Sequence, residues 1–135
     1  MRPAAFLLIT AAASACASSA APEPRTAKAQ TTLTRELAGK VAGAPVSCLP
    51  SYRSQDMVVV DDNTILFRDG RTVYRNDPPG GCSPLGSGNY TLVTKTIGST
   101  GLCRGDIATV VDLPNRFTVG SCTFGDFIPY KPATG

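Results

Sequence analysis

The chain has 135 residues, a formal net charge of +3 and no histidine. This length allows one domain, and the modest charge is unlike the basic surface of a nucleic-acid-binding protein, so we expect no nucleic-acid partner. The lack of histidine removes the commonest general base and a common zinc ligand. We therefore expect neither a metal site nor a cofactor.

Residues 1–15 have the features of an export signal. A short basic start is followed by an apolar run from Ala4 to Ala13 and then by small residues, which is the order found in secretory signal peptides. The apolar run is too short to cross a bilayer as a helix. We therefore expect residues 1–15 to be a signal peptide that is removed on export.

The residues around Cys16 indicate how the exported chain begins. Ala13-Ser14-Ala15-Cys16 resembles the lipobox of bacterial lipoprotein precursors, in which the cysteine becomes the acylated first residue and anchors the protein to the membrane. Ala17-Ser18 lacks the aspartate that is typical of retention at the inner membrane, so we expect an outer-membrane lipoprotein that faces the periplasm. A conventional cut after Ala17 or Ala20 would instead release a soluble periplasmic protein.

The segment after the anchor is predicted to be a tether followed by a short helix. Residues 16–32 are small and polar and contain proline, a composition typical of disorder. Residues 33–44 place Leu33, Leu37 and Val41 at helical spacing, with Thr34 as a possible cap and Gly43-Ala44-Pro45 as the stop. A helix of this length needs to dock on the domain to be stable.

Residues 45–135 have the pattern of a β-domain. Short β-branched and aromatic runs are separated by turn residues such as Asp61-Asp62-Asn63, Asp69-Gly70 and Leu113-Pro-Asn-Arg116. We expect strands at 57–60, 64–68, 71–75, 90–97, 107–111 and 117–123. About six such strands predict an all-β fold, either a small antiparallel barrel or a sandwich, with a short N-terminal helix and two disulfides.

Four cysteines remain after processing, and their spacing favours disulfides. The chain contains no Cys-x-x-Cys, so two disulfides in an oxidising compartment are a better interpretation than a zinc site. We predict that Cys48 pairs with Cys122 and Cys82 with Cys103. A Cys103–Cys122 bond is too long if 113–116 is the hairpin turn. The pairing of Cys48 with Cys103 and Cys82 with Cys122 stays open.

A set of motifs carries a resemblance to a known family. Gly43-x-Pro45-x-x-Cys48, Leu102-Cys103-x-Gly105-Asp106 and Cys122-x-x-Gly125-x-Phe127-x-Pro129 are similar to those of an uncharacterised domain-of-unknown-function family of small Gram-negative envelope proteins. The resemblance spans about residues 40–130 and implies no known activity. It implies that the Leu-Cys-x-Gly-Asp block belongs to the scaffold and that the residue before the glycine is free to vary.

Two functional hypotheses follow. The favoured one is a non-catalytic cell-envelope protein, a tethered β-domain that binds or supports a protein or small molecule of unknown identity. The alternative is a small periplasmic hydrolase that uses carboxylates, because without histidine the aspartates Asp61, Asp106 and Asp126 are the remaining candidates for acid–base work. If these aspartates converge in one pocket, the hydrolase is favoured; if they lie on separate turns, the binding protein is favoured.

The tripeptide Arg104-Gly105-Asp106 matches the sequence that adhesion ligands display. We predict that it is a structural turn, because Gly105 permits a positive φ and Asp106 can bind backbone amides two residues on. Cys103 holds one end of the turn and the strand at 107–111 follows the other.

Overall fold

The computed structural model describes residues 24–95 and 101–134. The predicted signal peptide and the lipidation site Cys16 lie outside these residues. The described residues form one helix and ten strands, in the order α1, β1 to β10, with short 3₁₀ turns η1 (Ser51–Arg53) and η2 (Leu85–Ser87). The predicted all-β fold with one short helix is confirmed, and the sheets stack in a sandwich-like arrangement and do not close into a barrel.

Helix α1 spans Ala27–Leu37 and therefore begins inside the segment that we predicted to be a disordered tether. Thr26 caps it, because its side-chain oxygen accepts a hydrogen bond from the backbone N–H of Ala29 at 3.2 Å. The prediction of a helix at 33–44 is wrong at both ends: β1 (Lys40–Ala42) occupies the second half of that range. Gly39, with φ of +67°, makes the turn between helix and strand.

The strands form three antiparallel sheets. The largest has the order β1-β10-β5-β4-β3, the second pairs β2 with β7, and the third has the order β6-β8-β9. The remaining bounds are β2 Cys48–Pro50, β3 Asp56–Asp61, β4 Thr64–Asp69, β5 Thr72–Asn76, β6 Tyr90–Thr94, β7 Gly101–Cys103, β8 Ile107–Asp112, β9 Thr118–Thr123 and β10 Phe127–Pro132. The six predicted strands correspond to β3, β4, β5, β6, β8 and β9, and β1, β2, β7 and β10 were not predicted.

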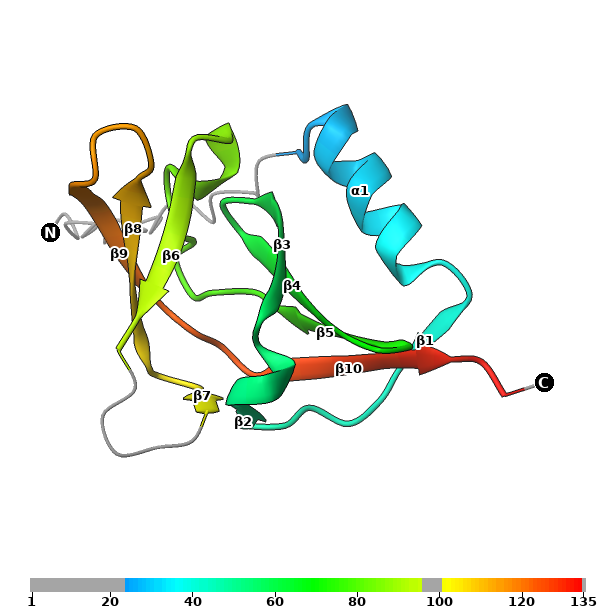
Figure 1. The fold of residues 1–135 in the computed structure, drawn as a ribbon. Coiled ribbons are helices and arrows are strands. Elements are labelled where there is room, and N and C mark those ends of the chain that lie inside the picture. Colours follow the sequence, from blue (N-terminus) through cyan, green and yellow to red (C-terminus); the bar gives the residue numbers. More distant parts are fainter. Residues whose placement is uncertain (1–23, 96–100, 135) are drawn as a thin grey trace, which may run out of the picture.

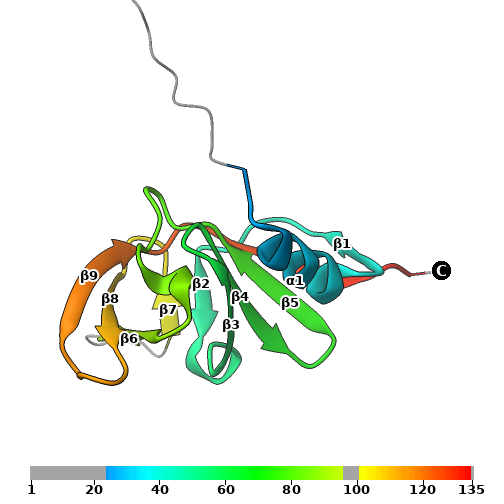
Figure 2. The same cartoon turned by 90° about the horizontal axis from the view of Figure 1, so that it is seen from above.

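The five-stranded sheet is covered on both faces (Figures 1 and 2). On one face, α1 packs Ala29 and Leu33 against Val60, Leu66 and Val73. The other face contributes to the larger core, which contains Leu49, Ile65, Phe67, Leu85, Leu102, Ala108, Val110, Phe124 and Phe127. Neighbouring side chains of a strand point to opposite faces, so the continuous apolar run of β4 is explained by its burial on both sides.

Strand β10 lies between β1 and β5 although Pro129 has no backbone N–H to donate. The carbonyl of Pro129 accepts from Gly43 N at 2.7 Å, and Phe127 exchanges hydrogen bonds with Val46. The backbone groups of Phe127 and Pro129 therefore point away from β5, toward the segment that follows β1. The N–H that Pro129 lacks thus removes no hydrogen bond from the pairing of β10 with β5. On the other side, the Asn76 side chain and Gly125 exchange two hydrogen bonds of 2.8 and 3.1 Å inside the core.

The disulfides are Cys48–Cys103 and Cys82–Cys122. Our predicted pairing of Cys48 with Cys122 and Cys82 with Cys103 is wrong, and the pairing left open is the one formed. The reason is the short β2–β7 sheet, which the sequence did not reveal: it places Cys48 directly opposite Cys103, with their Cα atoms 4.0 Å apart. The exclusion of a Cys103–Cys122 bond is confirmed, since Cys122 lies opposite Ala108.

Candidate functional site

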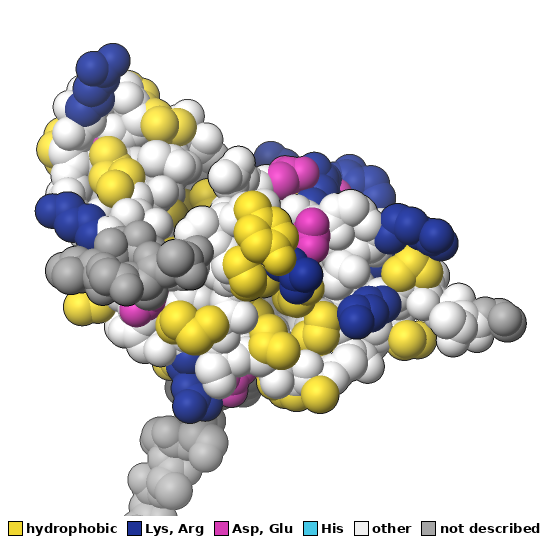
Figure 3. Space-filling model, turned by 60° about the horizontal axis from the view of Figure 1, so that its bottom comes forward, with side chains coloured by type: hydrophobic (Ala, Val, Ile, Leu, Met, Phe, Trp, Pro, Cys, Tyr) yellow, Lys and Arg dark blue, Asp and Glu magenta, His cyan; other side chains and the backbone are white. Residues whose placement is uncertain are grey.

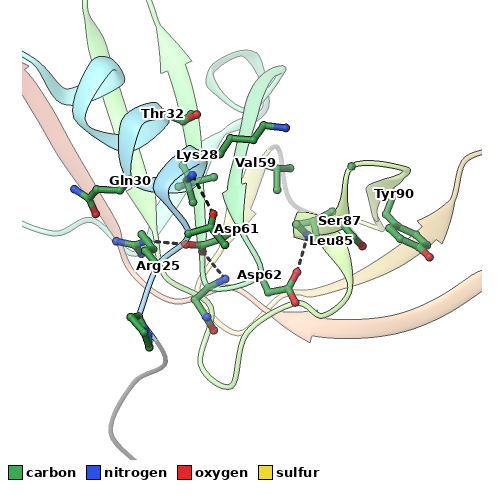
Figure 4. A pocket seen from close by; sticks show the side chains of 17 residues that line it. Arg25, Lys28, Gln30, Thr32, Val59, Asp61, Asp62, Leu85, Ser87 and Tyr90 are labelled. Atoms are coloured by element: carbon green, nitrogen blue, oxygen red, sulfur yellow. Dashed lines mark hydrogen bonds and ion pairs between the residues drawn. The ribbon is translucent and has the colours of Figure 1, made fainter.

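A groove of about 1000 Å³ lies beside the start of α1 (Figure 4). One wall is the first turns of α1, and the other is the loop that contains η2, together with the start of β6. Its base is the end of β3 and the turn that follows it. The side chains that line it include Arg25, Lys28, Gln30, Thr32, Val59, Asp61, Asp62, Ser87 and Tyr90.

An ion pair fixes the helix side of the groove. Arg25 Nε donates to Asp61 Oδ2 at 2.6 Å, and its Nη2 donates to the hydroxyl of Thr64. Thr64 is fully buried and its hydroxyl donates in turn to Asp77 at 2.8 Å. Arg25 and Asp61 therefore neutralise each other and attach the segment before α1 to the β3–β4 hairpin, where the side chain of Asp61 also accepts from the N–H of Asn63.

The opposite wall is attached to the same turn through Asp62. Its carboxylate accepts from Gly86 N at 2.6 Å, and its carbonyl accepts from Cys82 N at 2.6 Å. Gly86 has to be glycine, because a Cβ there would lie 2.9 Å from Asp62 N. The Cys82–Cys122 disulfide holds this loop against β9. Two elements far apart in sequence, α1 and the η2 loop, are thus fixed to one turn with the groove between them.

The groove offers polar groups and an aromatic side chain with little net charge. Arg25 is balanced by Asp61, and Lys28 faces the same space as Asp62 without a partner of its own among the residues that the structure describes. Ser87 and Gln30 are exposed, and Tyr90 is half-buried. No cluster of three or more acidic, histidine or cysteine side chains suited to a metal ion occurs in 24–95 or 101–134. Such a lining suits an uncharged, hydroxyl-rich ligand, with the tyrosine as an apolar contact.

The three candidate aspartates do not share this groove. Asp61 lines it but is paired with Arg25. Asp106 accepts from Cys103 N at 2.8 Å, and Asp126 pairs with Arg104 at 3.2 Å on the exposed surface. Asp106 and Asp126 do not line the groove with Asp61, so the convergence that would have favoured the hydrolase does not occur here.

The Arg104-Gly105-Asp106 stretch is a turn between β7 and β8. Gly105 has the expected positive φ, +88°. The carboxylate of Asp106 accepts from an amide three residues before it, Cys103 N, and not from amides that follow, which corrects that detail of the prediction. Asp106 N also donates to Cys103 O at 3.0 Å. The turn is therefore closed by its aspartate, while Arg104 contributes an exposed ion pair.

Sequence reasoning missed most of the groove. Lys28, Gln30 and Thr32 lie in the segment predicted to be disordered, and Ser87 lies in a proline- and glycine-rich loop that carried no chemical motif. The available signal was the pair Asp61-Asp62, which we interpreted as turn chemistry, with Asp61 also a candidate for acid–base work. Its two carboxylates in fact bind the two opposite walls.

No described helix has the length and apolar character to cross a membrane. Comparison with family models, curated proteins and solved structures finds no match to this chain.

Proposed function

We propose that this is an exported, non-catalytic protein of the cell envelope whose β-domain binds a polar ligand in the groove beside α1. The observation that carries the proposal is the pair of disulfides, Cys48–Cys103 and Cys82–Cys122. Disulfides of this kind persist in oxidising compartments and are rare in the cytosol. The signal-like residues 1–15 and the motif resemblance to Gram-negative envelope proteins support the same location.

In this proposal Cys16 is acylated and holds the domain near the outer membrane. The described residues begin at Pro24, and seven residues, 17–23, lie between it and Cys16 in the sequence. A fully extended chain of that length reaches about 24 Å. Pro24 and Arg25 line the groove, so the groove lies at the end of the domain where the anchor attaches.

The proposed ligand is an uncharged, hydroxyl-rich chain such as a cell-wall glycan. The two carboxylates at the base of the groove already bind Arg25 and Gly86 N, which leaves hydroxyl, amide and aromatic groups, together with Lys28, to face a ligand. The scattered positions of Asp61, Asp106 and Asp126 give no support to the hydrolase alternative.

Metabolic labelling with a fatty-acid analogue tests the anchor. We expect label on the wild-type protein and its loss in Cys16→Ala, together with a shift of the protein from the membrane to the periplasmic fraction. Label that survives in Cys16→Ala, or an unlabelled wild type, contradicts lipidation. Recovery of the protein from the cytosol with free thiols contradicts the proposal as a whole.

Co-sedimentation with purified peptidoglycan tests the groove. Ser87→Trp places a large ring at the exposed wall of the groove, and we expect it to lower the affinity at least about tenfold, a loss of about 1.4 kcal/mol. Ser47→Trp is the matched control, because Ser47 is exposed and lies outside the groove lining. Equal binding by the two variants, or no binding by the wild type, contradicts the proposed ligand.

A further inference from the structure

Strand β9, Thr118–Thr123, is an edge strand without the usual protection. Among the described residues it pairs with β8 on one side and with no strand on the other (Figures 1 and 2). Its sequence, TVGSCT, contains no charged residue and no proline. Soluble proteins commonly protect such edges with lysine, proline or a very short strand, because unpaired N–H and C=O groups can accept another strand.

The edges of the large sheet are protected in these ways. Strand β1 is three residues long and begins with Lys40. Strand β3 begins with Asp56 and ends with Asp61. In the three-stranded sheet both edge strands, β6 and β9, lack charged residues and proline, and β9 has the more exposed side chains of the two.

The backbone of β9 has hydrogen-bonding groups that point away from β8. Phe124 N donates to Asp106 O. The backbone N–H and C=O groups of the even-numbered residues near this end, such as Cys122 opposite Ala108, therefore point toward β8. Because backbone groups alternate along a strand, the N–H and C=O of Ser121 and Thr123 point outward from the edge. Both side chains are exposed, so another strand has access to this row.

A surface with several exposed apolar side chains adjoins the edge. Of the eight exposed large hydrophobic residues in the described part of the chain, five belong to the β6–β8–β9 sheet and its hairpin: Val93, Ile107, Leu113, Phe117 and Val119. Ile107 is 64% exposed and lies opposite Thr123 on the outer face. Apolar side chains are visible on this lobe in Figure 3. Surfaces of this kind mark interaction sites.

We propose that β9 pairs antiparallel with β9 of a second copy of this chain, which joins the two β6–β8–β9 sheets into one. The two ends of β9 differ in charge: exposed Arg116 precedes it, whereas Asp106 and the Arg104–Asp126 ion pair lie beyond its other end. An antiparallel pair related by a two-fold axis brings each Arg116 toward the acidic end of its partner, whereas parallel pairing brings like ends together. The uncharged strands between these ends meet without repulsion.

Sedimentation of purified Cys16→Ala chain over a concentration series tests the proposal without any contribution from an acyl group. We expect a reversible monomer–dimer equilibrium. Ser121→Lys places a lysine from each copy near the two-fold axis, and we expect it to weaken the dimer about tenfold or more while leaving the melting temperature of the monomer unchanged. Thr34→Lys is the matched control, because it adds the same charge to the exposed face of α1.

Hydrogen exchange locates the interface independently. The amides of Ser121 and Thr123 are expected to become protected at concentrations where the dimer forms and to exchange freely in the monomer. A chain that stays monomeric at every concentration overturns the proposal, and so does a dimer that Ser121→Lys and Thr34→Lys affect equally or that leaves these two amides unprotected. Binding of an extended peptide to a monomeric chain at β9 would assign the edge to a different partner.

Discussion

The two disulfides close loops of similar length but differ in burial, and this difference predicts which one stabilises the protein more. The sequence separations are 40 residues for Cys82–Cys122 and 55 for Cys48–Cys103. In the chain-entropy model these loops contribute about 3.9 and about 4.2 kcal/mol by restricting the unfolded chain. Loop closure alone therefore makes the exposed Cys48–Cys103 bond the slightly more stabilising of the two.

Burial reverses that order. Cys82 is 0% and Cys122 is 7% exposed, and both belong to the core with Leu85 and Phe124. Cys48 is exposed and Cys103 is half-buried. Replacing the buried pair with alanine also removes two sulfur atoms from the core, which costs about 1 to 2 kcal/mol more. We expect losses of about 5 to 6 kcal/mol for the buried pair and about 4 kcal/mol for the exposed one.

Urea unfolding at pH 7 of the double variants Cys82→Ala/Cys122→Ala and Cys48→Ala/Cys103→Ala measures both losses. If the buried double variant does not fold, the order is read from the reductant concentration at which each bond opens in the wild type, where the exposed bond is expected to open first. Equal losses, or a larger loss for the exposed pair, would refute the argument from burial. A Cys48–Cys122 peptide in unreduced digests would refute the pairing itself.

Three further predictions concern single side chains. Hydrogen bonds from Arg68 hold the pKa of Glu36 below its ordinary value of 4.5, so the ion pair stabilises the folded protein at neutral pH and this contribution is lost as the pH falls through the folded pKa. Glu36→Gln should therefore cost about 0.5 to 1 kcal/mol of unfolding free energy at pH 7 and nothing below the folded pKa. Urea melts of both proteins from pH 7 to pH 3 measure this difference. Asp106→Ala should cost about 1 kcal/mol because it leaves a turn amide without its acceptor, whereas Arg104→Ala removes one exposed ion pair and should leave the thermal midpoint nearly unchanged; equal midpoints would contradict the turn assignment. Leu33→Ala should cost about 2 to 4 kcal/mol by opening a cavity under α1, with loss of helical circular dichroism, and an unchanged spectrum and stability would show that the helix does not depend on docking.

Local sequence patterns were sufficient to predict the strands in which apolar and polar residues alternate or β-branched residues follow one another. The β3–β4–β5 meander could be predicted because its runs are bounded by Asp61-Asp62-Asn63 and by Asp69-Gly70, and Gly70 has the positive φ that such a turn requires. The three strands of the β6–β8–β9 sheet were predicted on the same basis. In the meander the side chains that favour a strand are also the ones that the fold buries or half-buries, whereas Val93, Ile107 and Val119 of the β6–β8–β9 sheet are exposed.

The strands that were missed depend on partners far away in sequence. Strands β2 and β7 are three residues each and form because they meet each other, with Gly101 in β7 allowing close approach to the backbone of β2. Strand β10, FIPYKP, contains two prolines and was not predicted. It is accommodated because the N–H that Pro129 lacks falls where β1 has ended. The sequence within a few residues of a strand carries no information about which distant strand it will pair with.

Helix α1 and the groove show the same limit. The sequence AKAQTTLTREL is polar and small, and Ala29 and Leu33 are its fully buried side chains, so its composition resembles that of a disordered tether. It is a helix here because Leu33 packs on the sheet and Arg25 binds Asp61. The sequence by itself determined the export-like start, the strand-rich domain and the need for two disulfides, since these depend on composition, periodicity and the parity of the cysteines. Tertiary structure alone decided which cysteines pair and which polar residues face the groove, because both depend on contacts between segments that are distant along the chain.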